Sequence, residues 1–224
     1  MFTGNSREVV SNQEGIHEHL DTVVTKHLKT EFQKPYAAHT VAAFEQVNQL
    51  VQAHSGRIIL DSCCGVGEST QYIAQRHPDA LVVGIDKSLS RINRHDGDVT
   101  AEKNYVLVRA DLNDFWRLAL EAGWVIDIHF LLYPNPWPKS KHLQRRWHGA
   151  PIFSTILQLG GQLFVRSNWQ TYIDEFHRAL EIAGIESHKA QYIVDEPMTP
   201  FERKYLQSGH QTWQVSCQLC QGSD

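Results

Sequence analysis

Short apolar runs alternate with amphipathic segments from residue 57 onward. Continuous apolar runs of this length are typical of strands that are covered on both faces of a sheet. They fall at residues 58–60, 81–85, 105–108, 125–133 and 161–165. A further run at 213–219 alternates apolar with polar residues, which predicts a half-exposed strand.

Most of the segments between these runs carry apolar residues at helical spacing. Helices are predicted at residues 37–53, 69–76 and 112–121, and another begins at Ser88. The clearest helix spans 169–183, where the apolar residues form one stripe and Gly184 supplies a C-cap. Alternating strands and helices predict an α/β fold with a mostly parallel sheet covered on both faces. We expect one domain over residues 36–224.

The first 35 residues are polar and weakly patterned, and we expect them to form a flexible N-terminal arm that a ligand can order. The 224-residue chain carries 21 Lys and Arg against 25 Asp and Glu, a net charge of -4. This balance excludes a histone-like polycation but allows a local basic patch. No apolar run reaches the roughly 20 residues of a membrane span, and residues 1–12 contain no apolar signal segment. We therefore expect a cytoplasmic protein with no membrane partner.

The cysteines do not form a recognisable metal or disulfide pattern. Tetrahedral zinc needs four converging ligands, but Cys217 and Cys220 point to opposite faces of the predicted strand. Cys63 and Cys64 lie in a glycine-containing loop. We expect free thiols in a reducing compartment, and no metal site.

Glycines follow the first predicted strand, and an aspartate stands at the end of each of the first three. The first strand ends at Asp61 and leads to Gly65 and Gly67, where the backbone can approach a ligand closely. Asp86 ends the second strand about 20 residues beyond Gly67, the spacing of a ribose-hydroxyl acceptor. Asp111 follows the third strand, where a carboxylate can accept from an adenine amino group.

These features favour S-adenosylmethionine over a dinucleotide. Thr70 stands where the dinucleotide fingerprint has its third glycine. Three carboxylates also disfavour a pyrophosphate, which prefers amides and cations. They suit a cationic adenosyl ligand, with Asp61 accepting from its α-ammonium group. The alternative is that each aspartate only ends a strand or caps a helix.

The fourth strand leads into a proline-rich loop, which we call the substrate loop (residues 133–139). Prolines on both sides of Asn135 stiffen it, and the Asn135 amide offers donors and an acceptor to a base edge. Trp137 and Trp147 are available for stacking on bases. The loop ends in a basic patch, which predicts phosphate binding or else a solvated helix face. The residues of the basic patch are Lys139, Lys141, His142, Arg145, Arg146 and His148.

Three ordered motifs resemble those of the tRNA (guanine-N7)-methyltransferase family. Residues 134–146 resemble its P-D-P-W-x-K-x-x-H…R-R signature, and residues 166–172 resemble its T-D-W-x-x-Y element. Residues 199–202 with Gly209-His210 resemble its T-x-F-E…G-H element. The resemblance extends over residues 57–219.

The resemblance implies a doubly wound, Rossmann-like methyltransferase sheet with an antiparallel C-terminal strand, S-adenosylmethionine as cofactor, and tRNA or another structured RNA as partner. The expected cofactor contacts are Asp61, Gly65, Gly67, Asp86, Asp111 and Asn135. The expected substrate contacts are Lys139, Asn168, Thr199 and Glu202, to which the basic patch adds Arg145 and Arg146. The expected catalytic residues are Asn135, Asn168 and Glu202.

Two departures from the family pattern bear on the methyl acceptor. Asn135 and Asn168 stand where the family has aspartates, and an amide accepts once where a carboxylate accepts twice from the guanine edge. Glu202 keeps one carboxylate for that edge, with His210 as its expected support. Guanine N7 carries a free lone pair, so methyl transfer to it needs no general base.

Other functions stay open at this point. The sequence Asn135-Pro136-Trp137 partly resembles the N-P-P-Y/W loop of methyltransferases that act on exocyclic amines, and another RNA or a small substrate is also compatible. A non-catalytic paralogue that binds S-adenosylmethionine or RNA would likewise explain two lost carboxylates. The sequence is compatible with either a monomer or a homodimer.

Overall fold

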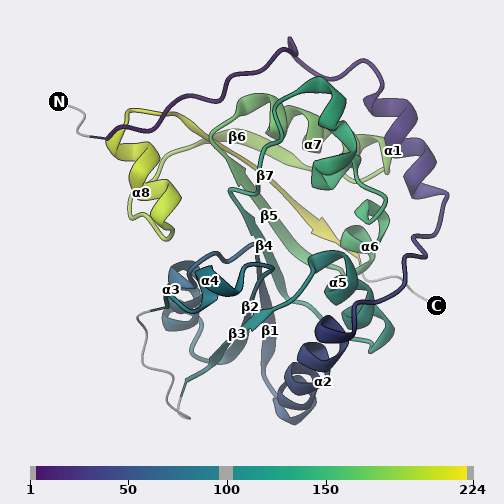
Figure 1. Ribbon diagram of the computed structural model, residues 1–224, viewed down its shortest axis with the longest axis vertical. Coiled ribbons are helices and arrows are strands. Elements are labelled where there is room, and N and C mark those ends of the chain that lie inside the picture. The colour runs from purple at the N-terminus through teal and green to yellow at the C-terminus, as the bar shows by residue number, and fades with distance from the viewer. Residues whose placement is uncertain (1–3, 96–102, 221–224) are drawn as a thin grey trace.

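The computed structural model describes residues 4–95 and 103–220, and within them one sheet of seven strands has the order β3-β2-β1-β4-β5-β7-β6. The strands are β1 (Arg57–Ser62), β2 (Ala80–Asp86), β3 (Tyr105–Arg109), β4 (Ile128–Leu132), β5 (Gly161–Ser167), β6 (His188–Tyr192) and β7 (Thr212–Leu219). Strands β1 to β5 are parallel, whereas β7 runs antiparallel to both β5 and β6. The predicted doubly wound α/β sheet with an antiparallel C-terminal strand is therefore confirmed (Figure 1).

Helices cover both faces of the sheet (Figure 1). They are α1 (Leu20–Leu28), α2 (Ala38–Ala53), α3 (Glu68–Arg76), α4 (Leu89–Ile92), α5 (Leu112–Glu121), α6 (Phe153–Gln158), α7 (Gln170–Ile182) and α8 (Pro200–Gln207), with 3-10 helices η1 (Ser140–Arg145) and η2 (Trp147–Gly149). In the described part of the chain, no helix has both the length and the apolar composition needed to cross a membrane.

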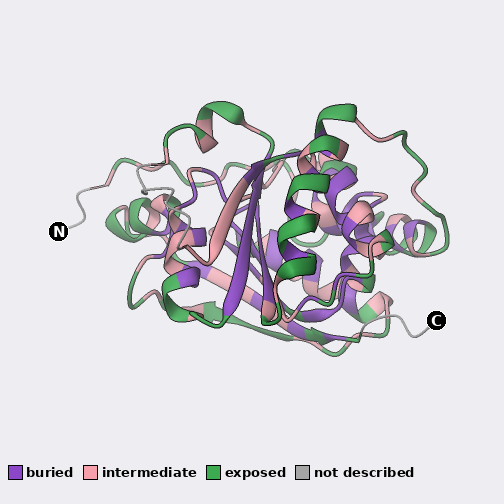
Figure 2. Cartoon of the chain, turned by 90° about the horizontal axis from the view of Figure 1, so that it is seen from below, coloured by how far each residue is buried: buried purple, intermediate pink, exposed green. Residues whose placement is uncertain are grey.

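Strand β1 illustrates how one sheet supports two cores. Ile58 and Leu60 join the larger core, which α1, α2, α5, α6 and α7 cover, whereas Ile59 joins the smaller core beside α3. This alternation follows from the two-residue period of a strand. Both faces are thus apolar, and Figure 2 shows the central strands as buried.

Some elements differ from the sequence prediction. Strand β4 begins only at Ile128, because Val125 is 63% exposed and the residues before the strand form a loop. Strand β6 was not predicted because its residues are mostly exposed and polar at the sheet edge. The short helix α8 was also missed, although Thr199 caps it by accepting from the Glu202 N–H (2.9 Å).

The N-terminal segment lies along the body of the molecule and includes the unpredicted helix α1 (Figure 1). Leu20 and Val24 of this helix are fully buried in the larger core. At the other end of the segment, the Gly4 N–H donates to the Gln207 carbonyl of α8 (2.8 Å). Leu20, Val23, Val24 and Leu28 stand at helical spacing, so a signal for this helix was present, but it extends over only nine residues. The separation into a flexible arm and a domain starting at residue 36 stays a prediction.

Gly84 in β2 allows α3 to approach the sheet closely. A Cβ atom at this position would lie 2.3 Å from Thr70 Oγ1, and Thr70 is held by its hydrogen bond to Asp61 Oδ2 (2.7 Å). We expect Gly84→Ala to lower the free energy of unfolding by about 1–3 kcal/mol in urea denaturation. The control is Gln52→Ala at an exposed position of α2, which should change it by less than about 0.5 kcal/mol. Wild-type stability of Gly84→Ala would contradict this close approach.

Candidate active site

A cavity of about 650 Å³ lies at the carboxyl ends of the parallel strands. In open α/β sheets, ligands bind at this edge, where the strand order reverses between β1 and β4. The residues that line it from successive strand ends are Cys63, Asp86, Asp111, residues 133–137 and Asn168. A larger hollow of about 980 Å³ between α6, the end of α7 and β7 contains none of the predicted site residues.

The loop after β1 combines two glycines with different constraints. Both Gly65 and Gly67 have positive φ angles, +62° and +82°. A Cβ atom on Gly67 would lie 2.5 Å from Leu107 Cδ1, whereas a Cβ atom on Gly65 would meet no heavy atom within 4 Å. Gly67 therefore permits close packing inside the protein, and Gly65 leaves open space next to the strand ends.

Asp61 is fully buried behind this loop and does not line the cavity. Its Oδ2 atom accepts hydrogen bonds from the hydroxyls of Ser69 and Thr70, both at 2.7 Å. Its Oδ1 atom is buried without a hydrogen-bond partner among the residues described. Burial raises the pKa of Asp61 to about 6, although both hydroxyls favour the charged form.

Asp86 and Asp111 line the cavity and also hold the local backbone. Asp86 Oδ1 accepts from the Ser88 N–H (2.8 Å), and Oδ2 accepts from the Gly65 N–H (3.1 Å) and pairs with Arg91 (3.2 Å). Asp111 caps α5 by accepting from the Asn113 N–H (3.0 Å). Asp111 therefore caps a helix, as the alternative interpretation expected, and also lines the cavity.

The substrate loop has a constrained backbone. Among the residues that the structure describes, the non-glycine residues with positive φ are Cys63 (66°), Tyr133 (49°) and Trp137 (47°). All three line the cavity. Such backbone conformations cost about 1–3 kcal/mol each and persist where the surroundings define them. The strain is thus concentrated at this cavity.

The two asparagines reach the cavity from adjacent strands, β4 and β5. Asn135 is exposed, and its Oδ1 atom accepts from the Trp137 N–H (3.3 Å). Asn168 Nδ2 contacts His210 Nδ1 at 3.4 Å. His210 also stacks on Tyr205, and its Nε2 atom contacts the Ser6 carbonyl at 3.1 Å, whereas its expected contact with Glu202 is not seen.

Thr199 and Glu202 do not line the cavity, contrary to the expectation that they contact substrate. Both are buried, and Thr199 caps α8. Glu202 accepts from the Tyr133 hydroxyl (3.0 Å), the Arg166 guanidinium (2.9 Å) and the Met198 N–H (2.9 Å). Its carboxylate therefore supports Tyr133 from behind the cavity wall and is not available to a base edge.

The basic patch divides into surface and interior residues. Lys139, Lys141 and Arg145 lie at the surface, and the Arg145 guanidinium lies 4.7 Å from the centre of the Trp137 ring. Arg146 is fully buried and forms an ion pair with Glu175 (2.6 Å). The predicted phosphate contact of Arg146 is therefore wrong, because its guanidinium is enclosed and already paired. His148 is likewise buried.

Cys63 lines the cavity as a neutral thiol, because burial and then the charge of Asp86 raise its pKa to about 12. It is thus a poor nucleophile. Residues 4–95 and 103–220 contain no group of three or more His, Cys, Asp or Glu side chains arranged to hold a metal ion.

Sequence reasoning missed several parts of the cavity wall, among them Arg91 and Tyr205. Tyr205 follows Phe201 by one helical turn, and the two rings stack at 6.1 Å. Two aromatic residues at this spacing in a polar helix were a usable signal. Arg91 had no such signal, because only the fold brings it to Asp86.

Comparison with known proteins gives one family match and many distant relatives. The family described as "Putative methyltransferase" matches residues 55–215. The tRNA (guanine-N(7)-)-methyltransferase of Nitrosospira multiformis is 28% identical over 191 residues, covering 78% of this chain and 80% of that protein. The protein of the same name from Ralstonia nicotianae is 26% identical over 197 residues, covering 82% of this chain and 75% of that protein.

Solved structures share the fold at low sequence identity. A structure titled as an antibiotic-related methyltransferase has a TM-score of 0.57 at 13% identity and covers 87% of this chain and 98% of its own. A 16S rRNA (adenine(1408)-N(1))-methyltransferase variant from Catenulisporales acidiphilia, with cosubstrate SAM, has a TM-score of 0.56 at 19% identity and covers 80% and 92%. These likenesses support the fold assignment.

The buried Asp61 predicts a pH-dependent stability difference. Its pKa is raised from 3.8 to about 6 in the folded chain, so its contribution to stability is most favourable below about pH 4 and is lost as the pH rises through 6. In Asp61→Asn, the amide would keep an acceptor for the two hydroxyls but would not ionise. We expect the stability of Asp61→Asn relative to wild type to improve by up to about 3 kcal/mol between pH 4 and pH 7.

Urea denaturation of both proteins at several pH values, without S-adenosylmethionine, measures this difference. Gln52→Ala, the exposed change on α2, controls for the general effect of acid because its difference from wild type should not vary with pH. A constant difference between Asp61→Asn and wild type would show that Asp61 does not carry the raised pKa.

Proposed function

The chain belongs to this methyltransferase family and uses S-adenosylmethionine as its methyl donor, and we propose that it transfers the methyl group to N7 of a guanine in tRNA. One observation carries the proposal. The same cavity has acidic strand ends on one side and, on the other, the substrate loop with basic surface residues beside it. The relatives named for this reaction match more than two thirds of the chain, which supports tRNA as the substrate.

The strand-end residues fit the methyl donor. Asp61 lies behind the cavity wall, but its Oδ1 atom is a buried acceptor without a partner among the described residues, and its negative charge favours a cationic α-ammonium group nearby. Asp86 Oδ1 has the Ser88 N–H as its donor and retains a lone pair for a ribose hydroxyl. Asp111 lines the cavity beside it, in reach of an adenine amino group, and Gly65 leaves open space for the ligand. When bound, the donor supplies a methyl group activated by its sulfonium charge.

Asn135 and Asn168 orient the acceptor base. Because Asn135 Oδ1 accepts from Trp137, its NH₂ group is left to donate to an acceptor such as guanine O6. Because Asn168 Nδ2 contacts His210, its Oδ1 atom is left to accept from guanine N1–H. Two neutral amides thus serve one acceptor, O6, and one donor, N1–H, of the guanine edge.

The main tasks of the site are to align guanine N7 with the methyl group and to exclude water. Guanine N7 attacks with its own lone pair, so the chain needs no general base. The rings of Trp137, Phe201 and Tyr205 line the cavity and can cover the base and keep water away from the reacting atoms. Glu202 contributes by holding the Tyr133 hydroxyl.

The basic surface residues provide the contact with the tRNA backbone. Lys139, Lys141 and Arg145 lie on the segment that directly follows Trp137. In a chain with a net charge of -4, this local positive charge next to the cavity directs a polyanion toward it.

The proposal is tested by methyl transfer from labelled S-adenosylmethionine to tRNA transcripts, followed by digestion to nucleosides. We expect the label in 7-methylguanosine. Asn168→Ala should lower kcat/KM by about fivefold, the effect of losing a hydrogen bond worth roughly 1 kcal/mol, and should leave the affinity for S-adenosylmethionine unchanged. Gln52→Ala, on the exposed face of α2, is the control with wild-type activity.

The labelled product also distinguishes the alternatives. Label on an exocyclic amino group would contradict N7 transfer and favour the amine-methylating function. Binding of S-adenosylmethionine and tRNA with no label in any RNA would contradict transfer altogether and indicate a non-catalytic paralogue.

The basic residues predict a change in the salt dependence of tRNA binding. Arg145→Gln and Lys139→Gln each remove one positive charge beside the cavity. Each should weaken binding and reduce the slope of log K against log salt concentration by about 1. Lys29→Gln makes the same change at an exposed position outside the cavity wall. Filter binding at several salt concentrations measures the slopes, and equal slopes for all three variants would contradict a phosphate contact at this patch.

A further inference from the structure

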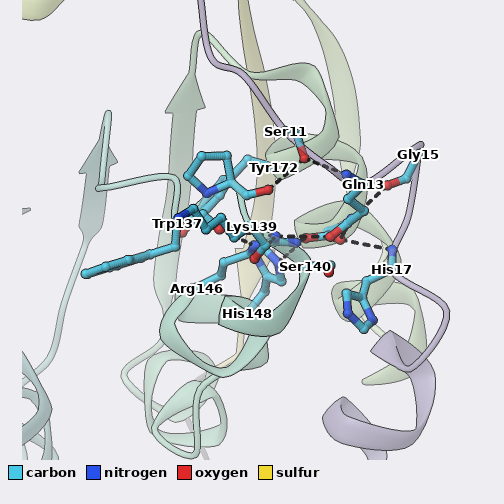
Figure 3. Close-up of polar contacts among 12 residues, drawn as sticks. Ser11, Gln13, Gly15, His17, Trp137, Lys139, Ser140, Arg146, His148 and Tyr172 are labelled. Carbon is cyan, nitrogen blue, oxygen red and sulfur yellow. Dashed lines mark hydrogen bonds and ion pairs between the residues drawn. The ribbon is translucent and has the colours of Figure 1, made fainter.

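A single buried carboxylate, Glu175 of α7, connects two distant segments of the chain. Its Oε2 atom pairs with Arg146 Nη1 (2.6 Å) and accepts from His148 Nε2 (2.9 Å). Its Oε1 atom accepts from Gln13 Nε2 (2.6 Å) and from the His17 N–H (3.0 Å). Figure 3 shows these partners converging from the N-terminal segment on one side and from the residues after the substrate loop on the other.

The charges of this cluster balance. Burial by itself raises the pKa of Glu175. The hydrogen bonds from His148 and Arg146 outweigh burial and lower this pKa to about 2. Burial lowers the pKa of His148, so the ring is neutral and donates through Nε2. The cluster therefore contains one carboxylate and one guanidinium, both fully buried. A buried pair of this kind is sensitive to the loss of either partner.

Arg146 uses its other N–H groups to hold the substrate loop. Its Nε and Nη2 atoms donate to the Trp137 carbonyl, both at 3.2 Å, and Nη2 also donates to the Lys139 carbonyl at 3.3 Å. Trp137 is the loop residue with a φ of 47°, and Asn135 Oδ1 accepts from its N–H. The conformation next to Asn135 therefore depends on where the Arg146 guanidinium lies.

The N-terminal segment holds the same loop from a second direction. The Ser11 hydroxyl donates to the Pro138 carbonyl (2.7 Å), and the Ser140 N–H donates to Asn12 Oδ1 (3.0 Å). Gln13, the next residue, is bound to Glu175 and also accepts from Arg146 (3.1 Å). Both sets of contacts, one through Arg146 and one through residues 11–13, thus start at Glu175 and end on the backbone of residues 137–140.

We propose that Glu175 is a positioning residue for methyl transfer, which holds the substrate loop in its working conformation through Arg146 and through the N-terminal segment. Glu175 does not line the cavity, so its effect on the acceptor is indirect. The inference rests on the proposed function for its effect on catalysis, whereas its effect on the loop is independent of the substrate.

The test compares Glu175→Gln with Asp174→Asn. Asp174 precedes Glu175 on α7 and pairs with Lys189 of β6 (2.5 Å), so its variant makes the same charge change on the same helix without touching the substrate loop. We expect Glu175→Gln to lower kcat by about 10- to 100-fold, because a small misplacement of orienting groups has effects of that size. Its affinity for S-adenosylmethionine, measured by calorimetry, should stay within about twofold of wild type, since the described contacts of Glu175 do not include the acidic residues Asp61, Asp86 and Asp111.

Hydrogen exchange supplies the readout that does not depend on activity. Amides in residues 134–142 and 11–17 should exchange at least about tenfold faster in Glu175→Gln than in wild type, whereas the core strands keep their protection. Asp174→Asn should match wild type both in kcat and in hydrogen exchange. If the wild-type chain methylates no RNA, the proposed function fails, and the exchange data still decide whether Glu175 holds the loop.

A milder variant covers the case in which Glu175→Gln does not fold. Gln13→Ala removes the contacts of Gln13 with Glu175 and Arg146 but leaves the Arg146–Glu175 pair. It should accelerate exchange in residues 134–142 and lower kcat several-fold, with S-adenosylmethionine affinity unchanged. Wild-type exchange and wild-type kcat in the folded variant, or an equal loss in Asp174→Asn, would overturn the proposal.

Discussion

In a parallel sheet every strand ends at the same edge, and this constraint assembles the cavity of the protein. Strands β1 to β5 run parallel, so the loops that follow them meet although Cys63 and Asn168 lie far apart in the sequence. Between β1 and β4 the chain leaves the sheet in opposite directions, which opens space for a ligand. Asp86 and Asp111 at the ends of β2 and β3 then line one part of the cavity, and the loops after β4 and β5 line another part.

Two buried carboxylates stabilise the strained substrate loop without lining the cavity. Glu202 accepts from the Tyr133 hydroxyl, and Glu175 holds Arg146, which donates to the Trp137 carbonyl. Tyr133 and Trp137 both have positive φ angles, a conformation that needs fixed surroundings. Each carboxylate is compensated by a buried arginine, so neither charge is left unpaired. In this protein, the two buried acidic residues shape the backbone beside the cavity, and the amides of Asn135 and Asn168 line it.

The sequence predicted the kinds of residue at the site better than their accessibility. Arg145 and Arg146 are neighbours in one basic patch, yet Arg145 is exposed and Arg146 is enclosed. Glu202 lies in a motif read as substrate-binding, but three donors occupy it inside the protein. Asp111 fits both of its interpretations, since it caps α5 and lines the cavity. Charge and motif identify a residue's chemistry, whereas its burial depends on what packs over it.

Hydrophobic periodicity by itself determined the parallel strands, most of the helices between them and the edge at which the cavity lies, because a sheet covered on both faces demands apolar runs. It did not determine the polar edge strand β6, whose local signal is weak, or the short helices α1 and α6. Only the tertiary structure decided which charged side chains face the cavity. Gln13, Arg146 and Glu175 come from three separate segments. No local sequence pattern predicts their contacts, because these form only when the three segments pack together.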